Sequence, residues 1–278
     1  MYDPLKPESP QLQVRVYQLF RDFFDRAEKK RRWNLRDDIP WDQCNPHLDP
    51  AIADVIETFC AVELYLPDYL SKAVPQVRHC RGRAWMYATW GYEESKHSMV
   101  MEEWLLRSGH RSEEQMADLD NSVFAHEWNL PHDNSRAMVC YAMIQELATW
   151  LHYNNLRKIV GPTGDPALHR LLTFIAVDER AHFDFFARLV QLYLEEDREG
   201  TLEQLRRVLN GFTMPAVHML SDSQRRIEQV RALHLFSENM LLNDVIDPCL
   251  ARLGLTRADL RRRNSPKSIM AMAAGRNA

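Results

Sequence analysis

The feature that most constrains the fold is a pair of Glu-x-x-His motifs on faces that are otherwise apolar. Between residues 171 and 193, large apolar side chains recur every three or four positions, as on the buried face of a helix. Glu179 and His182 interrupt this stripe at its centre, and Glu94 and His97 interrupt a second stripe between residues 86 and 104. The sequence therefore indicates long helices packed around polar groups.

Each of these motifs follows a helix-like stripe that carries one lone acid. Glu63 interrupts the apolar stripe of residues 52–70, and Glu146 interrupts that of residues 139–153. Glu63 precedes Glu94 by 31 residues, and Glu146 precedes Glu179 by 33 residues. The chain thus repeats one unit in pattern, a helix with a lone Glu followed by a helix with Glu-x-x-His.

Four ionised carboxylates on buried faces would each cost several kcal/mol if they had no partner. No Lys or Arg occupies these stripes near the acids, whereas two divalent cations would balance four carboxylates and two neutral imidazoles. Oxygen-rich ligation with two histidines suits iron or manganese, and the order of the motifs is that of a dinuclear site in a helical bundle. The alternative for any single Glu is a solvated position in a different helix register.

The rest of the chain favours an all-α fold, because it has only 9 Gly and no useful strand-type alternation. We expect long helices at 10–32, 50–73, 79–108, 133–159, 165–195 and 215–250, and shorter ones at 112–122, 201–211 and 256–263. Pro67 lies inside the second of these, where it predicts a kink.

Composition excludes several classes of protein. The net charge of −4 gives no nucleic-acid signature, and no apolar run approaches the roughly 18 residues of a membrane helix. The N-terminus has no signal-peptide pattern. Five scattered cysteines without a CxxC motif indicate reduced thiols in a cytoplasmic protein.

Several segments carry a resemblance to a known family. They are VELYLPDY at Glu63, WGYEESKH, YAMIQELATW, IAVDERAH, WNLRDDIP and TMPAVHM. At these segments the chain resembles the soluble acyl-carrier-protein desaturases (fatty acid desaturase type 2) of the ferritin-like di-iron superfamily. The resemblance implies one ferritin-like domain over 1–278, with a four-helix core at about 50–195 and flanking helices. The flanking parts would be an N-terminal helix and linker (1–49), C-terminal helices (200–263) and a flexible tail (264–278).

The resemblance also implies roles for individual residues. The iron ligands would be Glu63, Glu94, His97, Glu146, Glu179 and His182, with Glu94 and Glu179 as bridges. Asp178 would orient His97, and Trp33 would extend that path toward the surface for electrons. Thr149 would guide protons to the oxygen-binding face. The alternatives are an ordinary exposed acid at Asp178 and a helix-bonded core threonine at Thr149.

Some positions depart from the family pattern and leave the substrate open. Lys96 and Ala181 stand where an Arg usually precedes each histidine, the segment from Glu63 to Glu94 is short, and Met138 is bulky. Candidates for an acyl channel, or else for plain core, are Trp90, Met101, Val139, Met143, Phe183 and Phe186. Candidate carrier-docking patches, or else solvated helix ends, are Arg78, Arg81 and Arg83, and Lys29–Arg32.

The function implied by the resemblance is an O2-dependent di-iron desaturase that places a double bond in an acyl chain on acyl carrier protein. Two Fe ions, or Mn, would be the cofactor. Because the sequence has no GxGxxG motif, the two electrons would come from a separate ferredoxin-type donor. A homodimer is expected. The alternatives are a di-iron hydroxylase or oxygenase of a carrier-bound or free substrate, and a ferroxidase or iron-storage protein.

Overall fold

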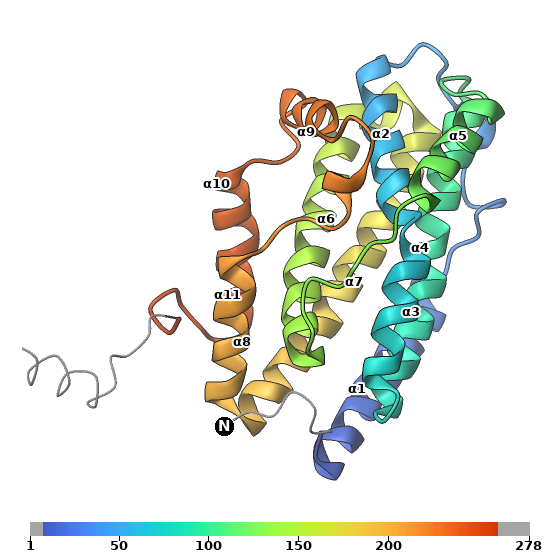
Figure 1. The fold of residues 1–278 in the computed structure, drawn as a ribbon. Coiled ribbons are helices and arrows are strands. Elements are labelled where there is room, and N and C mark those ends of the chain that lie inside the picture. The colour runs from blue at the N-terminus through green and yellow to red at the C-terminus, as the bar shows by residue number, and fades with distance from the viewer. Residues whose placement is uncertain (1–7, 261–278) are drawn as a thin grey trace, which may run out of the picture.

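The computed structural model describes residues 8–260, which contain helices and no strand (Figure 1). The all-α prediction is therefore confirmed. The helices are α1 (Pro10–Lys30), α2 (Pro50–Glu63), α3 (Leu66–Val77), α4 (Arg81–Arg107), α5 (Glu113–Phe124), α6 (Ser135–Gly164), α7 (Pro166–Glu196), α8 (Arg198–Asn210), α9 (Ser223–Ala232), α10 (Glu238–Met240) and α11 (Asp247–Arg252). No described helix has the length and apolarity needed to cross a membrane.

Four helices, α2, α4, α6 and α7, form the central bundle. α6 packs against α7 and α2 against α4, while α1 lies across α4 and α7 and α9 lies against α2 (Figure 1). α6 and α7 are joined through Gly161, whose φ of 63° is left-handed, and through the N-cap Asp165. The buried Asp165 also accepts hydrogen bonds from Trp104 Nε1 and the Asn45 amide, which ties the linker to this end of the bundle.

The single kinked helix expected at 50–73 is wrong, because the chain breaks into α2 and α3 at Leu64–Tyr65. Pro67 has no N–H and occupies the first turn of α3, a position that proline favours. The Tyr69 hydroxyl donates to the Val62 carbonyl at 3.0 Å, which satisfies one of the carbonyls at the end of α2. Glu63 is consequently the last residue of α2 and faces the bundle interior.

The single helix expected at 215–250 is also wrong. This segment contains a 3-10 turn (Val217–Met219), α9, α10, a π-helical turn (Leu241–Ile246) and the start of α11. The breaks coincide with left-handed backbone at Ala216, Asp222 and His234, where φ is 52–55°. Residues 256–260 form a turn rather than a helix, and 261–278, with the expected tail, lie outside the described residues. The single-domain organisation stays a prediction.

A buried ion pair fixes the start of α1 against the bundle. Glu8 accepts from Arg83 Nη1 at 2.6 Å and from the Tyr193 hydroxyl at 2.7 Å. Burial acts to raise the pKa of Glu8, but the charge of Arg83 and the hydrogen bonds outweigh it and lower the pKa to about 2. Because Arg83 is buried, it cannot belong to a docking patch for a carrier protein.

This pair predicts a pH-dependent stability. The carboxylate of Glu8 has a lowered pKa in the folded protein, so its contribution is present above about pH 4.5 and is lost as the pH falls toward 2. We expect Glu8→Gln to lower the free energy of unfolding by about 2–3 kcal/mol at pH 7, and the difference from wild type to shrink below pH 4.5. Urea titrations across this range measure it. Asp25→Asn, at an exposed ion pair, should change stability by less than about 0.5 kcal/mol, and an equal loss there would contradict the assignment.

Candidate metal centre

The structure brings together all six residues that the sequence singled out as ligands. Two sets of side chains have ligand atoms within 4.8 Å of one another, and both contain Glu94 and Glu179. One set is Glu63, Glu94, His97 and Glu179, and the other is Glu94, Glu146, Glu179 and His182. All six side chains are buried. Two four-residue sets that share two carboxylates are the arrangement expected for two bridged metal ions.

The two imidazoles present the same nitrogen to the carboxylates. His97 Nδ1 lies 2.9 Å from Glu94 Oε2 and 3.3 Å from Glu179 Oε1. His182 Nδ1 lies 2.9 Å from Glu94 Oε1 and 3.5 Å from Glu146 Oε2. On each ring the other nitrogen, Nε2, points to an acid outside the cluster, so each Nδ1 is free to face a metal ion.

Unsatisfied buried atoms support a fit to cations. Glu94 Oε1, Glu146 Oε2, Glu179 Oε1 and His182 Nδ1 are buried and make no hydrogen bond of good geometry, although Glu94 Oε1 and His182 Nδ1 lie 2.9 Å apart. An unsatisfied buried polar group costs about 1–3 kcal/mol, and more if it is charged. These four atoms all belong to the candidate ligands, so metal ions bound among them would satisfy all four at once.

The pKa values report the same crowding of negative charge. Burial, together with the neighbouring Glu94, raises the pKa of Glu63 to about 8. Burial and the carboxylates of Glu94 and Glu146 also raise the pKa of Glu179 well above its usual range. No described Lys or Arg pairs with either acid, and divalent metal ions would hold both in their ionised form.

Asp178 and Trp33 lie where the resemblance implied. Asp178 Oδ2 accepts from Trp33 Nε1 at 2.8 Å and lies 3.5 Å from His97 Nε2. Asp178 is buried, which rules out the alternative of an exposed acid. Trp33 is itself buried, with Lys96 Nζ 3.7 Å from its ring centroid and the Phe174 ring stacked on it at 5.2 Å. Phe174 is only partly buried, so a chain of contacts leads from His97 through Asp178, Trp33 and Phe174 toward the surface.

The sequence reasoning missed Glu93, the counterpart of Asp178. Glu93 Oε2 accepts from His182 Nε2 at 2.7 Å, and Glu93 is buried. Arg31 joins the two acids, because it donates to Glu93 at 2.9 Å and also pairs with Asp178. The signal was an acid directly before each Glu of the repeated motif, in EESKH and in DERAH. Arg32 also pairs with the buried Glu93, so the proposed docking patch at Lys29–Arg32 loses two of its charges, those of Arg31 and Arg32.

Two aromatic residues bind Glu63 and Glu146, the two carboxylates that belong to only one ligand set each. The Tyr153 hydroxyl donates to Glu63 Oε1 at 2.7 Å, and Trp90 Nε1 donates to Glu146 Oε1 at 3.1 Å. Both aromatic residues are buried. Tyr and Trp on ligand-bearing stripes were the available signal, since buried Tyr and Trp usually find hydrogen-bond partners.

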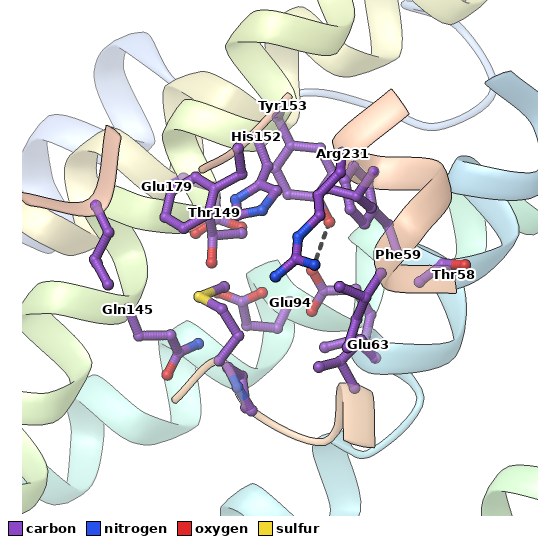
Figure 2. Close-up of a pocket in the computed structure, with 18 of the residues that line it drawn as sticks. Thr58, Phe59, Glu63, Glu94, Gln145, Thr149, His152, Tyr153, Glu179 and Arg231 are labelled. Carbon is purple, nitrogen blue, oxygen red and sulfur yellow. Dashed lines mark hydrogen bonds between the residues drawn. The ribbon is translucent and has the colours of Figure 1, made fainter. Parts of the chain in front are cut away.

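A cavity of about 280 Å³ reaches the cluster from the side of α9 (Figure 2). Glu63, Glu94 and Glu179 line it, and so does Thr149. The Thr149 hydroxyl makes no hydrogen bond with any residue in the described range, so the helix-bonded alternative is wrong. Of the six acyl-channel candidates only Trp90 lines the cavity, while Met101, Val139, Met143, Phe183 and Phe186 are buried core.

Comparison with known proteins identifies the family. A family model described as fatty acid desaturase matches residues 62–239, which is more than half of the chain and includes all six candidate ligands. This chain belongs to the fatty acid desaturase family. Trp33 lies outside the matched residues, so its place beside Asp178 is a finding of the structure.

Two relatives within this desaturase family are plant proteins. Stearoyl-[acyl-carrier-protein] 9-desaturase 2 of Arabidopsis thaliana is 27% identical over 142 residues, which are 50% of this chain and 34% of that protein. Acyl-[acyl-carrier-protein] desaturase 6 of Oryza sativa subsp. japonica is 29% identical over 175 residues, which are 58% of this chain and 41% of that protein. The matches thus span less than half the length of these relatives.

Solved structures confirm the ferritin-like fold of this desaturase family member. DesA2 of Mycobacterium tuberculosis H37Rv superposes with a TM-score of 0.65 at 18% identity, over 94% of this chain and 98% of that one. A variant of an R2-like ligand-binding oxidase with a Mn/Fe cofactor gives 0.58 at 18% identity, over 90% and 95%. At this identity the likeness concerns the fold.

The shared carboxylates predict distinct metal losses. We expect wild-type protein to bind two divalent ions per chain, Glu94→Ala to lose both, and Glu63→Ala to keep one, because Glu63 belongs to only one ligand set. Metal content per chain by mass spectrometry, with circular dichroism to verify folding, measures this. Glu103→Gln, on the same helix at an exposed ion pair, should keep both ions. Two ions retained by folded Glu94→Ala protein would refute the shared-ligand geometry.

Glu93 and Asp178 should matter equally for metal affinity. Each fixes one imidazole, and loss of such a partner typically weakens metal binding about 10–100-fold. We expect Glu93→Gln and Asp178→Asn to show weakening of this size in competition titrations with a chelator. Glu102→Gln on α4 is the matched control and should behave as wild type. If Glu93→Gln, like the control, left the metal affinity unchanged, the role of Glu93 in holding His182 would be wrong.

Proposed function

We propose that this protein is an oxygen-dependent, dinuclear-metal desaturase that removes two hydrogens from adjacent carbons of an acyl chain. The observation that carries the proposal is the pair of ligand sets sharing Glu94 and Glu179 at the end of a cavity. Iron, or a manganese–iron pair, held by the six ligand residues would supply the activation of O2. The names of the relatives suggest acyl carrier protein as the bearer of the substrate.

The chain's own residues would divide the remaining work. Desaturation takes two electrons and two protons from the substrate, and O2 needs two more of each to become two molecules of water. The second electron pair would come from a ferredoxin-type donor and enter by way of Trp33 and Asp178, which are hydrogen-bonded to each other at 2.8 Å. Thr149 would deliver protons from the cavity, because its hydroxyl lines that space and has no described partner.

Hydroxylation is the second candidate, since the same centre with the same electron supply could add one oxygen atom and release one water. The cavity favours either reaction over iron storage, because storage needs no enclosed site for an organic molecule. A homodimer in the cytoplasm completes the proposal, as the family resemblance implies.

Product analysis tests the proposal. We expect the iron-loaded protein, given a chemical or ferredoxin reductant and O2, to convert an acyl-carrier substrate to a product two mass units lighter. A product sixteen units heavier would instead establish hydroxylation. Absence of any O2-dependent product across carrier-bound and free acids, from protein that holds two irons, would overturn the proposed activity.

Thr149 provides a finer prediction within this assay. We expect Thr149→Val to lower turnover by about tenfold or more while two metals stay bound, because positioned proton donors contribute factors of that order. Thr149→Ser should restore most of the rate. Thr173→Val is the matched control, since the Thr173 hydroxyl donates to the His169 carbonyl and does not line the cavity. Unchanged turnover in Thr149→Val would remove Thr149 from the mechanism.

A further inference from the structure

One side of the mainly apolar cavity beside the candidate metal ligands carries polar groups, which a channel for the middle of an alkyl chain does not need. Gln145, Thr149 and His152 follow one another at helical spacing on α6, and all three line the cavity. Figure 2 shows Arg231 extending from α9 into the space that these side chains and Glu63 surround. Oxygen- and nitrogen-bearing groups therefore flank the same small volume as the carboxylates of the candidate metal centre.

His152 offers a fixed hydrogen-bond acceptor. Its Nδ1–H donates to the Ala148 carbonyl at 2.7 Å, and its ring stacks on Phe236 at a centroid distance of 4.2 Å. His152 is only 8% exposed, and burial lowers its pKa to about 4, so the ring is neutral near pH 7. With the proton on Nδ1, Nε2 carries a lone pair, and it has no partner among the described residues.

Arg231 offers a cation without a counter-ion. No described residue forms an ion pair or a hydrogen bond with its side chain, although other polar residues of the same helix are engaged. Arg226 binds Glu57 at 2.8 Å and Thr58 at 2.9 Å, and Gln229 binds Asp54 at 2.6 Å. These contacts anchor α9 on α2, so the orientation of α9 does not depend on Arg231, which remains available to a ligand at the exposed mouth.

Size and polarity together restrict what can bind. The cavity of about 280 Å³ lies near the lower limit for small-molecule sites, and aromatic side chains such as Phe59, Tyr69 and Tyr153 form much of its wall. A methylene group placed against an unpaired guanidinium would desolvate the charge without compensation. A carboxylate or carbonyl oxygen would instead accept charge-assisted hydrogen bonds.

We propose that this cavity binds the oxygen-bearing end of a compact, hydroxylated acyl substrate. A carboxylate or thioester carbonyl oxygen accepts hydrogen bonds from Arg231, and a substrate hydroxyl donates to His152 Nε2. The carbons nearest the metal ligands then lie within a few bonds of the acyl head, so oxidation takes place there and not in the middle of a long chain. This inference rests on the proposed function for its reaction but not for its binding contacts.

Binding can be measured without turnover. We expect the full chain to bind octanoate more tightly than 1-octanol in calorimetric titrations, and 3-hydroxyoctanoate more tightly than octanoate. Arg231→Gln should weaken octanoate binding about tenfold or more and leave 1-octanol unchanged. His152→Phe, which keeps an aromatic ring against Phe236, should abolish the advantage of the 3-hydroxyl group. Octanoyl-carrier protein, tested alongside, shows whether a thioester carbonyl takes the place of the carboxylate.

Controls separate recognition from general damage. Arg225→Gln removes another arginine of α9, one that pairs with Asp222 and does not line the cavity, and should bind octanoate as wild type does. The proposal is overturned if Arg231→Gln leaves both octanoate and octanoyl-carrier protein binding unchanged, or weakens 1-octanol equally. If the protein binds octanoate in a way that depends on Arg231 but shows no O2-dependent turnover, the proposed function is wrong and the binding proposal stands.

Discussion

The structure depends on one electrostatic constraint, the mutual repulsion of four carboxylates buried between four helices. Glu63, Glu94, Glu146 and Glu179 come from different bundle helices and converge in the buried interior of the bundle. Without cations among them, the bundle would be least stable at its own centre. Two divalent ions held there would turn the same four residues into cross-links between α2, α4, α6 and α7, so metal binding would favour bundle closure.

Asp178 and Glu93, the acids at the Nε2 atoms of His97 and His182, connect the two halves of the repeat. Asp178 on α7 faces His97 on α4, and Glu93 on α4 faces His182 on α7, so each half of the duplicated unit orients the imidazole of the other. Arg31 pairs with both acids, and Arg32 pairs with Glu93 as well. The symmetry ends at Trp33, whose Nε1 donates to Asp178 while no described tryptophan donates to Glu93. Contacts that lead toward the surface through Trp33 are therefore made on the Asp178 side.

The convergence of the six candidate ligands could be predicted because helical periodicity places them: in each repeated unit the lone Glu precedes the Glu of Glu-x-x-His by 31 or 33 residues, and only the correct register is needed. The same periodicity could not show that Pro67 ends α2 and begins α3, since a kink and a break share one pattern. It also could not pair Tyr153 with Glu63 or Arg31 with Glu93, because those contacts join helices far apart in the chain. The prediction of a single helix at 215–250 was wrong for a different reason. Three non-glycine residues in this segment have left-handed backbone, which no composition rule reveals.

The segment of residues 215–250 contributes to the cavity wall, whereas the long bundle helices carry the candidate metal ligands. Much of the cavity wall beyond these ligands comes from residues 214–241, a run of short helices and turns. Left-handed backbone at Ala216, Asp222 and His234 costs energy and persists only where surrounding contacts compensate for it. The ion pair from Arg226 to Glu57 is one such contact. Because this segment supplies Arg231 but none of the six candidate ligands, substitutions within it would alter the cavity wall while the candidate ligands stay in place on the bundle helices.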